Sequence, residues 1–148
     1  KLIIVGKIQD YDYYNKFISI LKELNLESRV IHHKTKTSKE IELISKDSTF
    51  FVSTSNWETF GRSIFEAFAT VLPSFLFEKL ECISEFIGIE DGLVRVNNYK
   101  EMAHEIIKLL NDQEKYALMS SQAHKSVLHL RSSEVNQQLV NYILEEVR

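Results

Sequence analysis

Apolar runs of three or four residues alternate along the chain with stretches in which apolar residues recur at intervals of three and four. The run LIIV at 2–5 is closed by Gly6 and has the pattern of a strand buried on both faces of a parallel sheet. Further strands are predicted at 29–32, 50–52, 74–77 and 93–96. Because crossover helices connect parallel strands, the alternation predicts an α/β fold with a Rossmann-like, doubly wound parallel sheet and helices on both faces.

The predicted helices each present one apolar face. The first ends near Asn25, a short one follows with Ser38 as its expected N-cap, and another is predicted over about 61–70. Asn98 and Glu101 have the spacing of a capping box at the start of a further helix. Two more helices are marked by apolar residues at helical spacing: Tyr116, Met119 and Ala123, then Val135, Leu139, Tyr142 and Val147.

With 148 residues, 44% of them apolar and 26% charged, the composition is that of a soluble globular chain, and we expect residues 1–148 to form a single domain. The net charge of −3 gives no reason to expect a nucleic acid as partner. The single cysteine, Cys82, excludes an internal disulfide and is typical of the reducing cytoplasm. No apolar run reaches the roughly 20 residues needed to cross a bilayer, and the N-terminus lacks the pattern of a signal peptide.

The stretch NWETFGRSIFEAFA at 56–69 places two carboxylates, Glu58 and Glu66, eight residues apart around Gly61. On one helix they would lie ~80° apart around the axis and share a face only loosely. If Glu58 lies on a loop and Glu66 in an early turn of the helix that begins near Gly61, both can border one cleft. They follow the strand at 50–52, and doubly wound sheets bind ligands at the carboxyl ends of their strands.

The predicted start of this helix has the features of a phosphate-binding site. A helix N-terminus presents unpaired N–H groups and a positive dipole end, Gly61 allows close approach, and Arg62 adds a forked positive donor. A carboxylate can accept hydrogen bonds from two adjacent sugar hydroxyls, so a phosphate site between Glu58 and Glu66 suits a nucleotide sugar. The simpler interpretation is that both glutamates are solvated surface residues.

The segment ETFGRSIFEAFATVLP resembles the E-x7-E segment of retaining GT-B glycosyltransferases, glycosyltransferase family 4 in particular. The matching residues are Glu58, Phe60, Gly61, Glu66, Ala67, Ala69 and Pro73. The resemblance continues through the IIVG strand, SRVIHH, Ser55, DGLVRV and the NNYKEMAHEIIKLLND helix, so it covers nearly the whole chain. It implies the C-terminal, nucleotide-sugar-binding half of a GT-B fold.

The resemblance also implies a role for each site residue. Glu58 would be the catalytic residue that contacts the transferred sugar, Glu66 would hold the ribose hydroxyls, and the backbone of 60–63 would meet the diphosphate and the sugar. The loop at Lys34 and Thr35 would lie near the base. The implied donor-binding residues are thus Lys34, Thr35, Phe60, Gly61, Arg62, Ser63 and Glu66. No metal site and no cofactor are expected, because the helix dipole and basic side chains offset the charge of the departing diphosphate.

By this resemblance the parent protein would be a hexosyltransferase that moves a sugar, with retention of configuration, from a nucleoside diphosphate sugar to a glycan or lipid-linked acceptor, as in polysaccharide biosynthesis. It would be cytoplasmic, and peripheral association with the inner face of a membrane is left open. The chain begins at Lys1 inside an apolar run, so we expect a fragment that lacks the first strand, its basic residues and the acceptor-binding N-terminal domain. Such a fragment is expected to be inactive by itself.

Departures from the family pattern keep other functions open. Val71 stands where the family mostly has Gly, Ser74 and Phe75 replace small or β-branched residues, and EKLECISE at 78–85 replaces a Gly-rich turn. The first alternative is a non-catalytic nucleotide-sugar-binding or regulatory module of GT-B fold. A GT-B-like epimerase or phosphorylase is a second alternative, disfavoured because the sequence shows no phosphate or pyridoxal site of such an enzyme.

Two further patterns have simple structural interpretations. Asp10 and Asp12 match the D-x-D with which a different class of glycosyltransferase binds Mn²⁺ or Mg²⁺, but they fall where a helix begins, and capping explains them more simply. The basic run over 29–39 could face a diphosphate or an anionic lipid surface, and more simply forms a solvated loop. Cys82 has no activating partner in the sequence and is expected to be inert.

Overall fold

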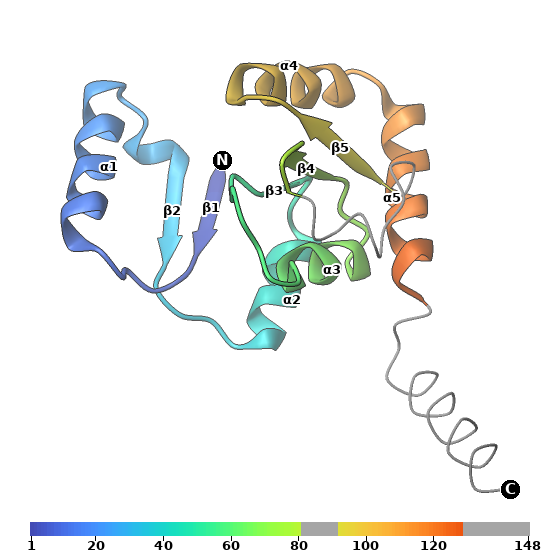
Figure 1. Ribbon diagram of the computed structural model, residues 1–148, viewed down its shortest axis with the longest axis horizontal. Coiled ribbons are helices and arrows are strands. Elements are labelled where there is room, and N and C mark those ends of the chain that lie inside the picture. Colours follow the sequence, from blue (N-terminus) through green and yellow to red (C-terminus); the bar gives the residue numbers. More distant parts are fainter. Residues whose placement is uncertain (81–91, 129–148) are drawn as a thin grey trace, which may run out of the picture. The chain divides into compact units, whose positions relative to one another are not determined.

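Strands and helices alternate along the computed structural model, which describes residues 1–80 and 92–128 (Figure 1). The chain divides into two units, Lys1–Ile44 and Ser45–Arg148, so the single domain expected over 1–148 stays a prediction. Neighbouring strands pair in parallel throughout the described part, which confirms the predicted α/β fold class. The helix expected over 135–147, Cys82 and the part of the 78–85 segment beyond Leu80 lie outside the described residues.

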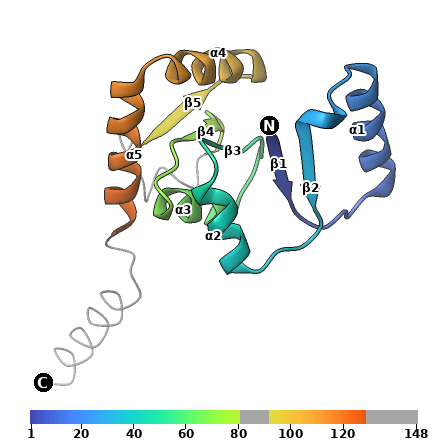
Figure 2. The same cartoon turned by 180° about the vertical axis from the view of Figure 1, so that it is seen from behind.

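The first unit contains β1 (Leu2–Val5), α1 (Tyr11–Glu23), the 3-10 turn η1 (Glu27–Arg29) and β2 (Val30–His33). α1 and η1 connect the two strands, as Figure 1 and, from behind, Figure 2 show. β1 and β2 pair in parallel with Leu2 opposite Val30. The sequence predicts the second strand from residue 29, but Arg29 belongs to η1, where its N–H donates to the Leu26 carbonyl at 2.8 Å.

Both ends of α1 are closed by the local sequence. Asp10 is the N-cap, and its carboxylate accepts from the Tyr13 N–H at 2.8 Å, so this half of the D-x-D pattern has a capping role. At the other end Asn25 takes the left-handed conformation with φ 55°, and the Leu26 N–H donates to the Leu21 carbonyl at 2.8 Å, as in a Schellman motif. The helix therefore ends next to Asn25, as the sequence predicts.

β1 is less buried than the sequence predicts. The LIIV pattern predicts a strand covered on both faces, but Leu2 is 48% exposed and Val5 is 37% exposed. The sheet of this unit has two strands, so each of them is an edge strand. A short apolar run indicates a strand, but it carries no information on how many neighbouring strands and helices cover that strand.

α2 (Ser38–Lys46) begins with a reciprocal cap, one residue earlier than predicted. The sequence predicts Ser38 as the N-cap, but Thr37 is the residue whose hydroxyl accepts from the Glu40 N–H, at 3.3 Å. In return Glu40 Oε2 accepts from the Thr37 N–H at 2.8 Å. Lys36 Nζ forms an ion pair with Glu40 Oε1 at 2.8 Å. The decisive signal is the glutamate three residues after Thr37, which completes a capping box that Ser38 cannot form.

The second unit contains a three-stranded parallel sheet in the order β3-β4-β5. Its elements are β3 (Phe51–Val52), α3 (Arg62–Ala69), β4 (Ser74–Phe77), β5 (Leu93–Val96), α4 (Tyr99–Leu110) and α5 (Gln113–Val127). Phe50 lies just before β3, and its ring packs edge to face against Phe75 at 5.4 Å and Tyr116 at 5.6 Å. Of the helices within 1–80 and 92–128, none is long and apolar enough to cross a membrane.

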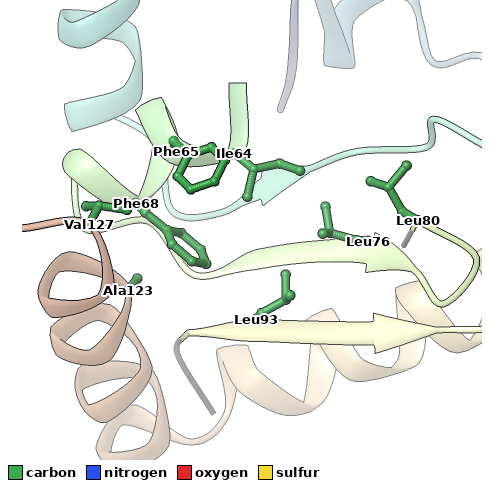
Figure 3. Packing of buried hydrophobic residues seen from close by; sticks show 8 residues of the cluster. All are labelled: Ile64, Phe65, Phe68, Leu76, Leu80, Leu93, Ala123 and Val127. Atoms are coloured by element: carbon green, nitrogen blue, oxygen red, sulfur yellow. The ribbon is translucent and has the colours of Figure 1, made fainter. Parts of the chain in front are cut away.

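Helices cover both faces of β4, the central strand of this sheet. Phe75 and Leu76 are adjacent and so point to opposite faces, and both are fully buried. The cluster on the Leu76 face is shown in Figure 3 and comprises Ile64, Phe65, Phe68, Leu76, Leu80, Leu93, Ala123 and Val127. The cluster on the Phe75 face comprises Phe75, Val96, Met102, Leu109 and Met119. The predicted sheet with helices on both faces is confirmed in this unit.

α4 begins at the predicted cap. Asn98 Oδ1 accepts from the N–H groups of Lys100 and Glu101 at 3.0 and 3.1 Å. The Glu101 carboxylate reaches back to the Asn97 N–H at 2.8 Å, one residue before the position that a capping box uses. The start of this helix is therefore held by two side chains that are local in the sequence.

Candidate functional site

The loop after β3 is tied to the sheet by hydroxyl groups. The buried Ser53 donates its N–H to the Phe75 carbonyl at 2.9 Å, which extends the pairing of β3 with β4 by one residue. The Ser53 hydroxyl then accepts from the Ser55 N–H at 3.4 Å. The Ser55 hydroxyl in turn donates to Glu58 Oε1 at 3.0 Å. Two serines thus form a short relay from the sheet to the first carboxylate.

Glu58 lies on this loop, as the spacing argument expects, and is half-buried. The bond from Ser55 occupies Oε1, while Oε2 has no hydrogen-bond partner within residues 1–80 and 92–128. A carboxylate fixed through one oxygen can offer the other to a ligand hydroxyl. The structure therefore leaves Glu58 able to accept a hydrogen bond at the carboxyl end of β3.

Among residues 1–80 and 92–128, no side chain caps the N-terminus of α3. Its N-cap is Gly61, a buried residue with φ 72° and ψ 36°, a conformation that glycine adopts without a steric penalty. The Gly61 carbonyl accepts from the Ile64 N–H at 2.9 Å, and the first-turn residues Arg62 and Ser63 are exposed. The positive end of the helix dipole therefore has no side-chain partner among residues 1–80 and 92–128, and the first-turn residues that follow the buried Gly61 are exposed.

Arg62 and Glu66 lie one turn apart on α3 and form an ion pair with 3.5 Å between Nη2 and Oε1. The arginine side chain is 82% exposed and the glutamate 47% exposed. Exposed pairs of this kind contribute little to stability, so a ligand can compete for either partner at small cost. Glu66 lies on the helix, as the sequence predicts, and is the fifth of the eight residues of α3, in the second turn.

Phe60 directly precedes Gly61 and stacks on Phe65 of α3, with 5.0 Å between ring centroids and 19° between ring planes. Phe65 is buried, whereas Phe60 remains partly exposed. This contact links the end of the loop to the side of the helix. It thereby supports the turn at Gly61 from which the helix begins.

Six of the eight predicted site residues belong to one continuous segment of the second unit. These are Glu58, Phe60, Gly61, Arg62, Ser63 and Glu66. Lys34 and Thr35 follow β2 in the first unit, where both are exposed. Within the part of the chain that the structure describes, no three or more His, Cys, Asp or Glu side chains gather in a group that could hold a metal ion.

Sequence reasoning gave no role to two residues of this loop. Ser53 anchors the relay. The sequence feature that could have identified it is a hydroxyl side chain directly after a predicted strand. Trp57, the only tryptophan of the chain, is 76% exposed and immediately precedes Glu58. The sequence does not show whether a tryptophan is exposed, so Trp57 could be recognised as a surface residue beside a carboxylate only from the structure.

In many α/β proteins a glycine-led helix N-terminus at the carboxyl side of a parallel strand binds an anionic ligand, and the second unit of this chain has that class of architecture. Within this class the family can be named. Residues 1–126 match the family model for Glycosyl transferases group 1, and the chain belongs to this family. No curated protein gives a significant match.

Solved structures show the same fold. Anabaena HepE in complex with UDP-glucose is 23% identical with a TM-score of 0.80, over 97% of this chain and 40% of that chain. Sucrose-phosphate synthase from Thermosynechococcus elongatus is 17% identical with a TM-score of 0.80, over 99% and 38%. A mutant of S. aureus TarM with Fondaparinux, alpha-GlcNAc-glycerol and UDP is 25% identical with a TM-score of 0.73, over 95% and 28%. The chain thus spans about 40% or less of the length of these proteins, and its fold matches that of GT-B glycosyltransferases.

Proposed function

We propose that this chain is the nucleotide-sugar-binding domain of a retaining glycosyltransferase of family 4. The observation that carries the proposal is the uncapped N-terminus of α3, led by the left-handed Gly61, with Glu58 before it and Glu66 behind it. The family match and the UDP-glucose complex of a protein with the same fold support it. The nucleotide sugar itself is proposed on these grounds.

The diphosphate is proposed to bind at the start of α3. Its negative charge would meet the N–H groups of the first turn, the positive end of the helix dipole and the exposed guanidinium of Arg62. The same groups stabilise the charge that develops as the diphosphate leaves, so the proposed chemistry does not use a metal or a cofactor. Gly61 has no Cβ to hinder a phosphate oxygen.

The two glutamates are proposed to hold the sugars on either side of the diphosphate. Glu58 Oε2 would accept a hydrogen bond from a hydroxyl of the transferred sugar. Glu66 would give up its exposed ion pair with Arg62 and accept hydrogen bonds from the ribose hydroxyls instead. Ser63 and Phe60 would contribute their backbone beside Gly61. Lys34 and Thr35 of the first unit are proposed to lie near the base.

The reaction of the parent protein is proposed to be transfer of a hexose to a glycan or lipid-linked acceptor with retention of configuration. The bond between the anomeric carbon and the diphosphate oxygen breaks with its electron pair going to that oxygen, a bond from the acceptor oxygen to that carbon forms, and the proton of the acceptor hydroxyl passes to the departing diphosphate. The chain contributes the donor half of this reaction, so alone it is proposed to bind donor without transferring the sugar. Cytoplasm is the proposed location of the parent.

Titration of the 148-residue chain with nucleoside diphosphates and their sugars tests the proposal. UDP, GDP, UDP-glucose, UDP-N-acetylglucosamine and GDP-mannose form a suitable panel, followed by calorimetry or ligand-observed NMR. We expect at least one pair to bind weakly, with a Kd of about 1 mM, because the chain spans about 40% or less of the length of the proteins whose fold it shares. Absence of binding by every member would overturn the proposal.

Two substitutions distinguish the roles of the glutamates. Glu66→Ala is expected to weaken a bare nucleoside diphosphate about tenfold by removing the ribose contact, while Glu58→Ala affects mainly the nucleotide sugar. Glu114→Ala, at an exposed glutamate in the first turn of α5, is the matched control and should leave binding unchanged. Equal affinity of wild type and Glu66→Ala would contradict the ribose role.

A further inference from the structure

Trp57 is the most exposed large apolar side chain of the described residues, at 76%. Aromatic side chains of this size bury 150–250 Å² in a typical core or interface, so leaving one in water forgoes a large favourable contribution. Single exposed apolar residues are common on protein surfaces and by themselves need no explanation. The position of Trp57 beside Glu58 distinguishes it from these.

The backbone around Trp57 is held on both sides. Before it, Ser53 is bonded to Phe75 of β4 and Ser55 to the carboxylate of Glu58. After it, the Phe60 ring stacks on α3 and the chain turns at the buried Gly61. A side chain that projects from an anchored loop loses little freedom when a ligand covers it, which favours binding.

We propose that Trp57 is a platform on which the sugar ring of the donor stacks. A pyranose has an apolar face of C–H groups and a polar edge of hydroxyls. The indole provides an apolar surface for the face, and Glu58, one residue later, provides an acceptor for the edge. The inference rests on the function proposed above and adds to it a residue that selects for the sugar.

The order of groups along the segment favours the sugar over the base as the partner of Trp57. In the proposed site Glu58 contacts the sugar, the N-terminus of α3 holds the diphosphate, and Glu66 holds the ribose. The indole precedes Glu58 and so belongs to the sugar end of this series. The nucleobase, which also stacks well on aromatic rings, is attached to the ribose at the opposite end.

The test uses the fact that the chain has one tryptophan, so fluorescence excited at wavelengths that tryptophan absorbs and tyrosine does not reports on this position alone. The full 148-residue chain is titrated with UDP, UDP-glucose, GDP and GDP-mannose. The nucleotide sugar that binds is expected to shift the emission to shorter wavelength and to protect the indole from iodide quenching. The matching bare nucleoside diphosphate is expected to leave both unchanged.

Calorimetry on variants provides a second readout. Trp57→Ala should weaken the nucleotide sugar about fivefold to tenfold and leave the bare nucleoside diphosphate unchanged, while Trp57→Phe should retain most of the affinity. Tyr99→Ala, at another exposed aromatic residue, is the matched control and should change neither affinity.

The outcomes separate this inference from the function on which it rests. If no ligand binds the wild type, the proposed function fails and the platform with it. If Glu66→Ala weakens binding while Trp57→Ala leaves the nucleotide sugar unaffected, the function stands and the platform is overturned. Equal weakening of bare diphosphate and nucleotide sugar by Trp57→Ala would assign the indole to the base and overturn the sugar platform.

Discussion

Val71 holds a left-handed backbone conformation, φ 61°, that branched side chains rarely adopt. It follows the C-cap of α3, where its N–H donates to the Phe68 carbonyl at 3.0 Å and the Leu72 N–H donates to the Ala67 carbonyl at 3.0 Å. These two bonds define a Schellman motif, in which the residue at the position of Val71 is usually glycine. The geometry explains why glycine is favoured here and shows that valine keeps the same turn at a cost in strain.

Val71→Gly is expected to stabilise the chain by about 1 kcal/mol. The left-handed conformation costs a residue with a Cβ roughly 1–2 kcal/mol, and glycine removes this strain. Part of the stabilisation is offset because glycine has more conformational freedom to lose when the chain folds. Val71 is exposed, so little buried area is lost. Urea unfolding followed by far-UV circular dichroism measures the change.

Asn25→Gly is the matched control for this prediction. Asn25 occupies the same position after α1, also with positive φ, and asparagine tolerates that conformation better than valine does. Its replacement should therefore yield a smaller gain. A free energy of unfolding for Val71→Gly no greater than that of the wild type would show that the strain is relieved in some other way.

At the scale of elements, the starts of α1, α2, α4 and α5 depend on side chains within three residues of the cap, whereas α3 has no side-chain cap among the described residues. The carboxyl of Glu40 at the start of α2 is the clearest case. Hydrogen bonding from Lys36, followed by bonds from the Thr37 N–H and hydroxyl, lowers the pKa of Glu40 from 4.5 to about 2. A carboxyl with a lower pKa in the folded chain stabilises the fold above its unfolded pKa.

Glu40→Gln is therefore expected to lower the free energy of unfolding at pH 7, and the difference from wild type should shrink as the pH falls from about 4.5 toward 2. Denaturant unfolding across this range measures the difference, and NMR titration of the Glu40 side chain measures its pKa directly. Lys36→Met removes the largest cause of the shift and should raise the pKa of Glu40. A difference between wild type and Glu40→Gln that stays constant with pH would contradict the assignment.

At the scale of the whole molecule, the two sheets differ in how completely their strands are covered. β4 has fully buried residues on both faces, whereas β1 exposes Leu2 and Val5 at the ends of a two-stranded sheet. Local opening costs least where few apolar contacts must be broken. Protection of backbone amides against hydrogen exchange should therefore differ between the two sheets.

Amide hydrogen exchange in the full chain is expected to be slowest in β4 and at least tenfold faster in β1, because β1 can open without disrupting a doubly covered core. Exchange followed by mass spectrometry or NMR measures both segments in one sample. Protection of β1 equal to that of β4 would show that β1 is covered in solution.

Much of the fold was predictable because its signals are local. The period of apolar residues located the helices, and cap residues such as Asn98 marked a boundary to within a residue. Ser38 was the wrong cap because two adjacent hydroxyl residues offer the same signal, and only the reach of Glu40 to Thr37 separates them. Glu58 and Glu66 were placed on a loop and a helix from spacing alone, and their roles in binding stay predictions.

By itself, the sequence determined where strands and helices form, which face of each helix is apolar and which carboxylates accompany the glycine-led helix. These properties depend on groups within a few residues of each other, so a short stretch contains them. The tertiary structure alone decided that β4 is covered on both faces while β1 is not, that Ser53 and Ser55 hold Glu58, and that Trp57 remains exposed. Burial is set by elements distant in sequence that meet only in the folded chain, and no local pattern contains that information.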